Sequence, residues 1–94
     1  MKLRFTERAF AEREDIFEYL NERSPEAARA VFAYLSAAIA QLLDLPHTGA
    51  RTDDEDVRVL FIVRYPYKVF YRLRGETIEI LHIRHTARRP LNLE

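Results

Sequence analysis

The sequence predicts an α+β fold, in which an antiparallel helical hairpin covers one face of an antiparallel sheet. Three observations predict it: a short alternating run opens the chain, two helical patterns separated by a capping signal follow, and three β-patterned runs come last. A chain of 94 residues with 48% hydrophobic content can bury a core of its own. We therefore expect residues 1–94 to form a single domain.

The N-terminal half is expected to supply one strand and both helices. Lys2–Thr6 alternates polar and apolar residues, which is typical of a half-buried strand. Thr6 can cap a helix over about residues 7–22, whose apolar side chains recur at helical spacing. Ser24-Pro25-Glu26 predicts a second helix start, since serine supplies a capping oxygen and proline fits the first turn. Because few residues separate the helices, they are expected to pack antiparallel.

The C-terminal half is expected to form a three-stranded antiparallel meander. Leu45-Pro46 and Gly49 end the second helix, and residues 51–56 predict an exposed polar loop. Three strands are expected at 57–63, 67–73 and 77–83, with Arg74-Gly75 as a tight turn between the last two. The element order is then β-α-α-β-β-β. The sheet face away from the helices should be open and carry some of Arg58, Arg64, Lys68, Arg72 and Arg84.

Charge is unevenly distributed along the chain, although 15 basic and 15 acidic side chains give a formal net charge of zero. Residues 1–56 carry seven basic and twelve acidic side chains, whereas residues 57–94 carry eight basic and three acidic ones. This asymmetry predicts a directional basic face that fits an acidic partner or a phosphate backbone.

Composition excludes several classes of protein. Without cysteine the chain has neither disulfides nor a thiolate zinc site, and two glycines are too few for a glycine-rich phosphate loop. The longest uncharged run, residues 30–43, is shorter than the roughly 20 residues that cross a bilayer, and no signal peptide is apparent. We expect a cytoplasmic protein with no cofactor, no metal and no membrane association.

A cluster of histidines and arginines lies near the C-terminus. Imidazole titrates near neutral pH and guanidinium binds phosphate, so the cluster could cleave RNA. In the alternative, His82 caps an apolar face and Arg84 pairs with a helix carboxylate. No paired carboxylate, lysine cluster or tyrosine accompanies the histidines, which favours this structural interpretation. As a ribonuclease site, the candidate residues are Arg58, Lys68 and Arg84 for the phosphate charge and His82 or His85 for the proton.

Aromatic and basic residues alternate in the strand expected at 67–73. Such a pattern can form a base-stacking platform, but aromatic residues on strands more often form cross-strand core pairs. Alternation sends Tyr67, Val69 and Tyr71 to one face and Lys68, Phe70 and Arg72 to the other.

The apolar stripe of the second helix is wider than contact with one sheet requires. It fits an alanine-rich packing seam and a surface for a partner helix equally well, and the sequence leaves both open. The residues expected at such a partner surface are Val31, Tyr34, Leu35, Ala38, Ile39 and Leu42.

Short motifs in a fixed order resemble those of the RelE/ParE toxin superfamily, specifically its ParE-like plasmid-stabilisation branch. One departure is Ala50, which stands where the family often has a residue of a Gly-Arg turn, although Arg51 follows. The motifs that carry the resemblance are Tyr19-Leu20 with Ser24-Pro25 and Ala27-Ala28-Arg29, Leu45-Pro46 with Gly49, Arg58, Tyr65-Pro66-Tyr67, Val69-Phe70-Tyr71, and His82-Ile83-Arg84-His85 with Ala87-Arg88-Pro90.

The resemblance implies a small bacterial toxin that a ParD-like antitoxin holds inactive in a hetero-oligomer, with the β-α-α-β-β-β layout. Members of the ParE type poison DNA gyrase, whereas members of the RelE type cut messenger RNA on the ribosome. This chain has only Lys2 and Lys68 as lysines, no tyrosine after Tyr71 and no net charge, which favours the gyrase type without nuclease activity. A non-toxic relic that only binds antitoxin is a third alternative.

The gyrase interpretation names a target-binding surface, and we expect no sequence-specific DNA binding by this chain alone. The residues expected to bind the target are Arg58, Arg64, Arg84, His85 and Arg88. The antitoxin is expected to cover the apolar surface of the second helix and the sheet edge.

Overall fold

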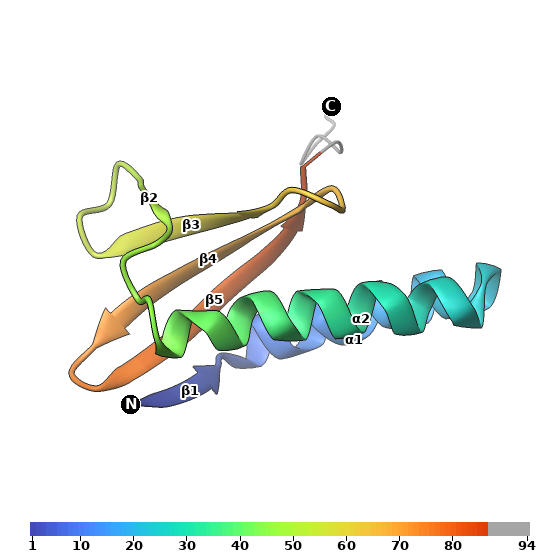
Figure 1. Cartoon of the computed structure of the whole chain (residues 1–94), viewed down its shortest axis with the longest axis horizontal. Coiled ribbons are helices and arrows are strands. Elements are labelled where there is room, and N and C mark those ends of the chain that lie inside the picture. Colours follow the sequence, from blue (N-terminus) through green and yellow to red (C-terminus); the bar gives the residue numbers. More distant parts are fainter. Residues whose placement is uncertain (87–94) are drawn as a thin grey trace.

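Within residues 1–86, five strands form one sheet in the order β1-β5-β4-β3-β2. The computed structural model describes residues 1–86 of the chain, and Figure 1 shows both helices on the same side of the sheet. The elements are β1 (Lys2–Phe5), α1 (Glu7–Arg23), α2 (Pro25–Ala40), the 3-10 helix η1 (Gln41–Leu43), β2 (Ala50–Arg51), β3 (Val57–Ile62), β4 (Tyr67–Arg74) and β5 (Thr77–His85).

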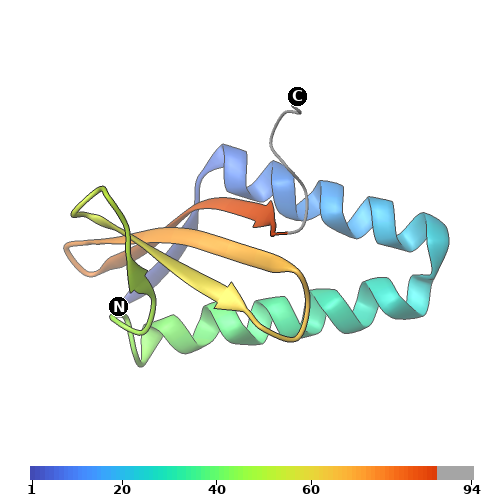
Figure 2. The same ribbon diagram turned by 90° about the horizontal axis from the view of Figure 1, so that it is seen from above.

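The helical hairpin begins and turns at two capping residues that the sequence identified. The Thr6 hydroxyl accepts the N–H of Ala9 at 3.1 Å, and the Ser24 hydroxyl accepts the N–H of Ala27 at 3.1 Å. The Ser24 N–H also donates to Leu20 at the end of α1, so one residue both ends α1 and starts α2. Figure 2 shows that the tip of this hairpin extends beyond the ends of the strands.

The predicted meander of β3, β4 and β5 is confirmed, with Gly75 at φ 60° in the β4–β5 turn. Two features of the sheet differ from the prediction. β1 runs parallel to β5, with Lys2 opposite Thr77, so the sheet is not wholly antiparallel. Ala50–Arg51 forms the edge strand β2, at the start of the expected loop, because its backbone pairs with β3.

The core lies between the hairpin and the sheet. Tyr67, Val69 and Tyr71 of β4 share one face, as strand alternation predicted; they are at most 6% exposed, and this face is the one towards the helices. From α2 and η1, Leu35, Ile39 and Leu42 contribute side chains that are at most 2% exposed. A core of this composition is held mainly by the burial of aliphatic and aromatic surface.

One segment, Pro25–Leu43, is long and apolar enough to cross a membrane by length and composition alone. Its residues Leu35, Ile39 and Leu42 belong to the core described above. A core helix passes the same test of length and composition, so the segment is weak evidence for a membrane span.

Candidate functional site

The sheet face away from the helices, which we call the open face, is organised in three rows across neighbouring strands. Strand register places opposite residues on the same face. One row contains Phe61, Lys68 and Arg84, and the next contains Val59, Phe70 and His82. The third row contains Val57, Arg72, Glu79 and Arg4.

Glu79 joins the two arginines of the third row. Its carboxylate forms an ion pair with Arg4 and accepts a hydrogen bond from Arg72 Nε at 2.7 Å. The hydrogen bonds from Arg72 and Arg4 lower the pKa of Glu79 from 4.5 to about 2. Glu79 therefore offsets part of the charge of Arg4 and Arg72, whereas Lys68 and Arg84 of the first row form no ion pair within residues 1–86.

His82 lies at the border between the open face and α1. Its ring packs edge-on against Phe70 at 5.6 Å, and its Nδ1 lies 3.3 Å from Glu12 Oε2. Burial lowers the pKa of His82, and the Glu12 carboxylate opposes part of this shift. Glu12 Oε1 accepts a hydrogen bond from the backbone N–H of Ile83 at 2.8 Å. The pairing of β5 with β1 ends at Ile80, so a side chain of α1 takes the place of a strand partner for this N–H group.

Arg58 does not lie on the open face, which corrects the expectation that it shares a target surface with Arg84. Its position opposite Tyr71 places it on the helix-facing side of β3. There the guanidinium donates to the carbonyl of Gly49 at 2.8 Å and to that of His47 at 3.3 Å. The geometry makes Arg58 an internal clamp on the segment between η1 and β2.

Arg64 and His85 are also separated from the first row of the open face. The Arg64 guanidinium lies 5.9 Å from the ring of Tyr34 and 5.8 Å from that of Tyr65, near the tip of the β3–β4 hairpin. His85 is opposite Tyr67, with 5.3 Å between their rings, and therefore faces the helices. Arg88 falls outside the described residues. Of the five residues expected to bind the target, Arg84 alone is placed on the open face of the described chain.

The expected antitoxin surface on α2 is largely internal, which corrects that expectation. Val31, Leu35, Ile39 and Leu42 are at most 7% exposed because they pack into the core. Tyr34 is 39% exposed and Ala38 is partly buried. A partner on this side can therefore contact Tyr34 and the edge of Ala38 while the helix stays on the sheet.

The five candidate ribonuclease residues are divided between the two faces of the sheet. Lys68, His82 and Arg84 lie on the open face, whereas Arg58 and His85 lie on the helix-facing side. Within residues 1–86, no group of three histidine, cysteine or acidic side chains is arranged to hold a metal ion. Lys68, His82 and Arg84 thus share one face of the sheet, whereas Arg58 and His85 are not brought together with them.

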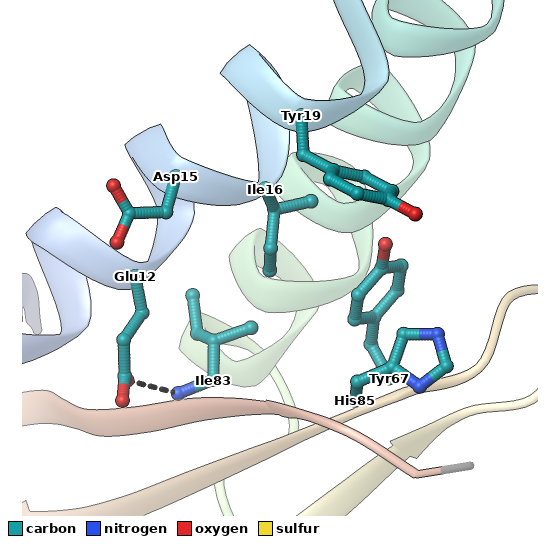
Figure 3. A pocket seen from close by; sticks show the side chains of 7 residues that line it. All are labelled: Glu12, Asp15, Ile16, Tyr19, Tyr67, Ile83 and His85. Atoms are coloured by element: carbon teal, nitrogen blue, oxygen red, sulfur yellow. Dashed lines mark hydrogen bonds between the residues drawn. The ribbon is translucent and has the colours of Figure 1, made fainter. Parts of the chain in front are cut away.

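A cavity of about 310 Å³ lies on the helix-facing side, between α1 and the ends of β4 and β5. No residue of α1 was named as a candidate from the sequence, so the cavity was not predicted. No local pattern indicates the cavity, because α1 and β5 are about 70 residues apart in sequence. Figure 3 shows the residues that line it, which are Glu12, Asp15, Ile16, Tyr19, Tyr67, Ile83 and His85.

Comparison with known proteins agrees with this fold. The family model for the ParE toxin of the type II toxin-antitoxin system parDE matches residues 3–90. The protein Y4kP of Sinorhizobium fredii is 30% identical over 84 residues, which are 89% of this chain and 86% of the relative. Toxin RelE2 of Caulobacter vibrioides is 33% identical over 84 residues, which are 89% of this chain and 93% of that protein.

A solved structure of the chromosomal ParDE toxin-antitoxin system from P. aeruginosa is similar over most of its length. It superposes with a TM-score of 0.79 and 26% identity, covering 90% of this chain and 95% of the solved chain. Both relatives and this structure match nearly whole chains. The chain therefore belongs to the ParE toxin family of type II toxin-antitoxin systems.

Proposed function

We propose that this toxin inhibits DNA gyrase by binding it, without cleaving RNA, and that a ParD-like antitoxin neutralises it in the cytoplasm. The observation that carries the proposal is the row of Phe61, Lys68 and Arg84 across three strands of the open face. In this row the ring of Phe61, which is 54% exposed, lies in line with two cationic side chains. Arg58, which was expected to help hold the phosphate charge, lies on the other face of the sheet, and this supports the same choice.

This row has the chemistry of a protein-binding surface. Aromatic residues and arginine are enriched where binding energy concentrates in interfaces. Lys68 and Arg84 would meet carboxylates of an acidic partner, while Phe61 would bury apolar surface beside them. Such a site traps its target by binding energy and requires no bond-breaking group on the toxin.

The proposal is tested with purified gyrase and the variant Arg84→Glu. Addition of the unaltered toxin should block supercoiling and accumulate gyrase–DNA cleavage complexes. Arg84→Glu should weaken the inhibition at least tenfold, because it places a carboxylate against an acidic partner. Arg29→Glu is the matched control, since it makes the same charge change on an exposed position of α2 and should change inhibition less than twofold.

Two results would contradict the proposal. Unaltered supercoiling by gyrase in excess toxin, together with codon-phased cuts in messenger RNA after expression, would instead establish a RelE-like ribonuclease. Normal growth during expression without antitoxin would establish a non-toxic relic. Mapping transcript ends and measuring growth in the same cultures separates these outcomes.

A further inference from the structure

We propose that the cavity between α1 and β5 receives an arginine side chain of the antitoxin. The inference depends on the antitoxin part of the proposed function and is independent of the toxin's target. It concerns the face of the toxin opposite to the row of Phe61, Lys68 and Arg84. Figure 3 shows carboxylates of α1 at one side of the cavity and aromatic rings at the other.

The acidic wall comes from successive turns of α1. The Glu12 carboxylate is fixed by the Ile83 N–H at 2.8 Å and by Arg8 Nε at 3.3 Å. A carboxylate has about four lone-pair sites, so Glu12 retains capacity for another donor. Asp15 is exposed and forms no ion pair or hydrogen bond within residues 1–86. Both carboxylates favour a cationic ligand and disfavour an anionic one.

The opposite wall consists of rings. Tyr67 and His85 lie with their ring centres 5.3 Å apart in an edge-on arrangement, and Tyr19 is 43% exposed at the cavity mouth. The Arg23 guanidinium lies 3.8 Å from the centre of the Tyr19 ring, so one face of this ring is already covered by a guanidinium of the toxin itself. The cavity thus combines carboxylates with aromatic faces.

Guanidinium fits both walls better than an ammonium group does. It is planar, so it can stack on a ring while its in-plane N–H groups donate to carboxylates. An ammonium group offers no flat face and is more strongly hydrated. The basic groups beside the cavity are Arg8 at Glu12, Arg23 over the Tyr19 ring, and His82, whose Nδ1 lies beside Glu12 and whose pKa burial lowers. None of the three lines the cavity itself.

Charge distribution favours the antitoxin as the source of this arginine. The C-terminal part of the toxin carries eight basic and three acidic side chains, so an antitoxin segment that covers it should be acidic. A basic residue of the antitoxin needs a separate acidic site, and α1 supplies one. Pairing opposite charges at two places fixes the register of an extended partner across the toxin.

The first experiment uses acetyl-arginine amide as the probe and NMR of the Tyr19, Tyr67 and His85 rings as the readout. We expect a Kd of about 1 mM, as for a fragment of this size. Acetyl-citrulline amide, which has the same shape without the charge, should bind at least tenfold more weakly. Acetyl-lysine amide binding as tightly as the arginine probe would overturn the assignment of guanidinium.

The second experiment measures the affinity of the intact antitoxin for two charge-matched toxin variants. Asp15→Asn should weaken binding about tenfold, because a charge-assisted hydrogen bond is lost. Glu18→Gln removes the same charge from an exposed position of α1 that does not line the cavity, and should weaken binding less than twofold. Unchanged thermal unfolding of both variants establishes that they are folded.

An arginine-to-glutamine scan of the antitoxin completes the test. We expect one arginine-to-glutamine substitution in the antitoxin to weaken its binding to the unaltered toxin. The same substitution should not weaken binding to the Asp15→Asn toxin any further, because the contact is already lost there. Equal effects of Asp15→Asn and Glu18→Gln would overturn the proposal. An antitoxin that does not bind the unaltered toxin at all would contradict the proposed function instead.

Discussion

The Tyr71 hydroxyl accepts a hydrogen bond from the backbone N–H of Gly49 at 2.9 Å. The same hydroxyl donates to the carbonyl of Pro46 at 2.7 Å, and the ring is fully buried. Burial raises the pKa of Tyr71, so its proton is retained across the physiological range. Together with Arg58, this side chain ties residues 46–49 to the centre of the sheet.

Replacing Tyr71 with phenylalanine should destabilise the fold by about 1–3 kcal/mol, because two buried backbone groups lose their partner. Urea denaturation measures the change. Tyr34→Phe is the matched control, since Tyr34 is 39% exposed and should change the free energy of unfolding by less than about 0.5 kcal/mol. Equal stability of the two variants would contradict the role assigned to Tyr71.

Replacing Gly49 with alanine should destabilise the fold by about 1–3 kcal/mol through overpacking. An added Cβ would lie 2.7 Å from both Cε1 and the hydroxyl of Tyr71, whose ring is held by the core and cannot move aside. Gly75→Ala is the comparison variant, because its cost comes from the backbone conformation and not from a close contact. There a Cβ meets nothing within 4 Å, but the φ of 60° costs about 1–2 kcal/mol. The double variant Gly49→Ala/Tyr71→Ala should recover part of the loss attributed to contact, whereas no coupling between the two positions would contradict it.

The stability of the protein should fall as the pH falls from 4.5 towards 2, in part because of Glu79. The pKa of Glu79 is about 2 in the folded protein, whereas the ordinary value of 4.5 applies in the unfolded chain. Between these two values the unfolded chain binds the proton more readily than the folded protein does. The stabilisation is fully present above pH 4.5 and is lost as the pH falls through 2. Glu79→Gln should flatten the dependence of unfolding free energy on pH, whereas Glu76→Gln, an exposed neighbour, should leave it unchanged.

The pKa of His82 measured by NMR should lie below 6.5, because burial disfavours the charged ring. A lowered folded pKa means that His82 contributes stability above pH 6.5 and loses it as the pH falls through the folded value. Glu12→Gln should lower the pKa of His82 further, since the carboxylate raises it. A pKa that rises in this variant would show that Glu12 does not act on His82 as the structure indicates.

Arg58 and Arg84 should affect toxicity for different reasons. Arg58→Ala removes hydrogen bonds to the carbonyls of His47 and Gly49 and should destabilise the fold by about 1.5–3 kcal/mol. Arg84→Ala should change stability by less than about 0.5 kcal/mol, because this half-buried side chain forms no hydrogen bond or ion pair within residues 1–86, while it weakens target inhibition. Thermal unfolding beside an inhibition assay separates the two. Loss of inhibition by Arg58→Ala without loss of stability would contradict the internal role.

Local signals predicted most of the fold. Thr6 and Ser24 act as caps, Gly75 takes the positive φ of a tight turn, and alternation sorts Tyr67, Val69 and Tyr71 from their neighbours. Each of these features depends on a few adjacent residues, so it can be predicted from the sequence. The edge strand β2 and the parallel pairing of β1 depend on partners distant in sequence, and no local pattern encodes them.

The candidate site was predicted less completely because strand faces depend on register. The ladder between β4 and β5 shifts between Phe70 and Tyr71, which inserts one residue into β5. Before the shift, the even-numbered residues Ile78 and Ile80 face the core. After the shift, Ile83 faces the core, and the even-numbered residues His82 and Arg84 face outward. The shift also turns His85 towards the helices. A list of basic residues from the sequence therefore mixes side chains from both faces.

The parallel pairing of β1 with β5 bears on when this toxin becomes active during its synthesis. Lys2 lies opposite Thr77 and Phe5 opposite Ile80, and the Thr6 N–H donates to the Ile80 carbonyl at 3.0 Å. During synthesis β1 leaves the ribosome first, and it cannot pair until β5 has also emerged. A translation product that stops before Thr77 thus lacks the pairing partner of its N-terminal strand, and the sheet can be completed only after β5 has been made.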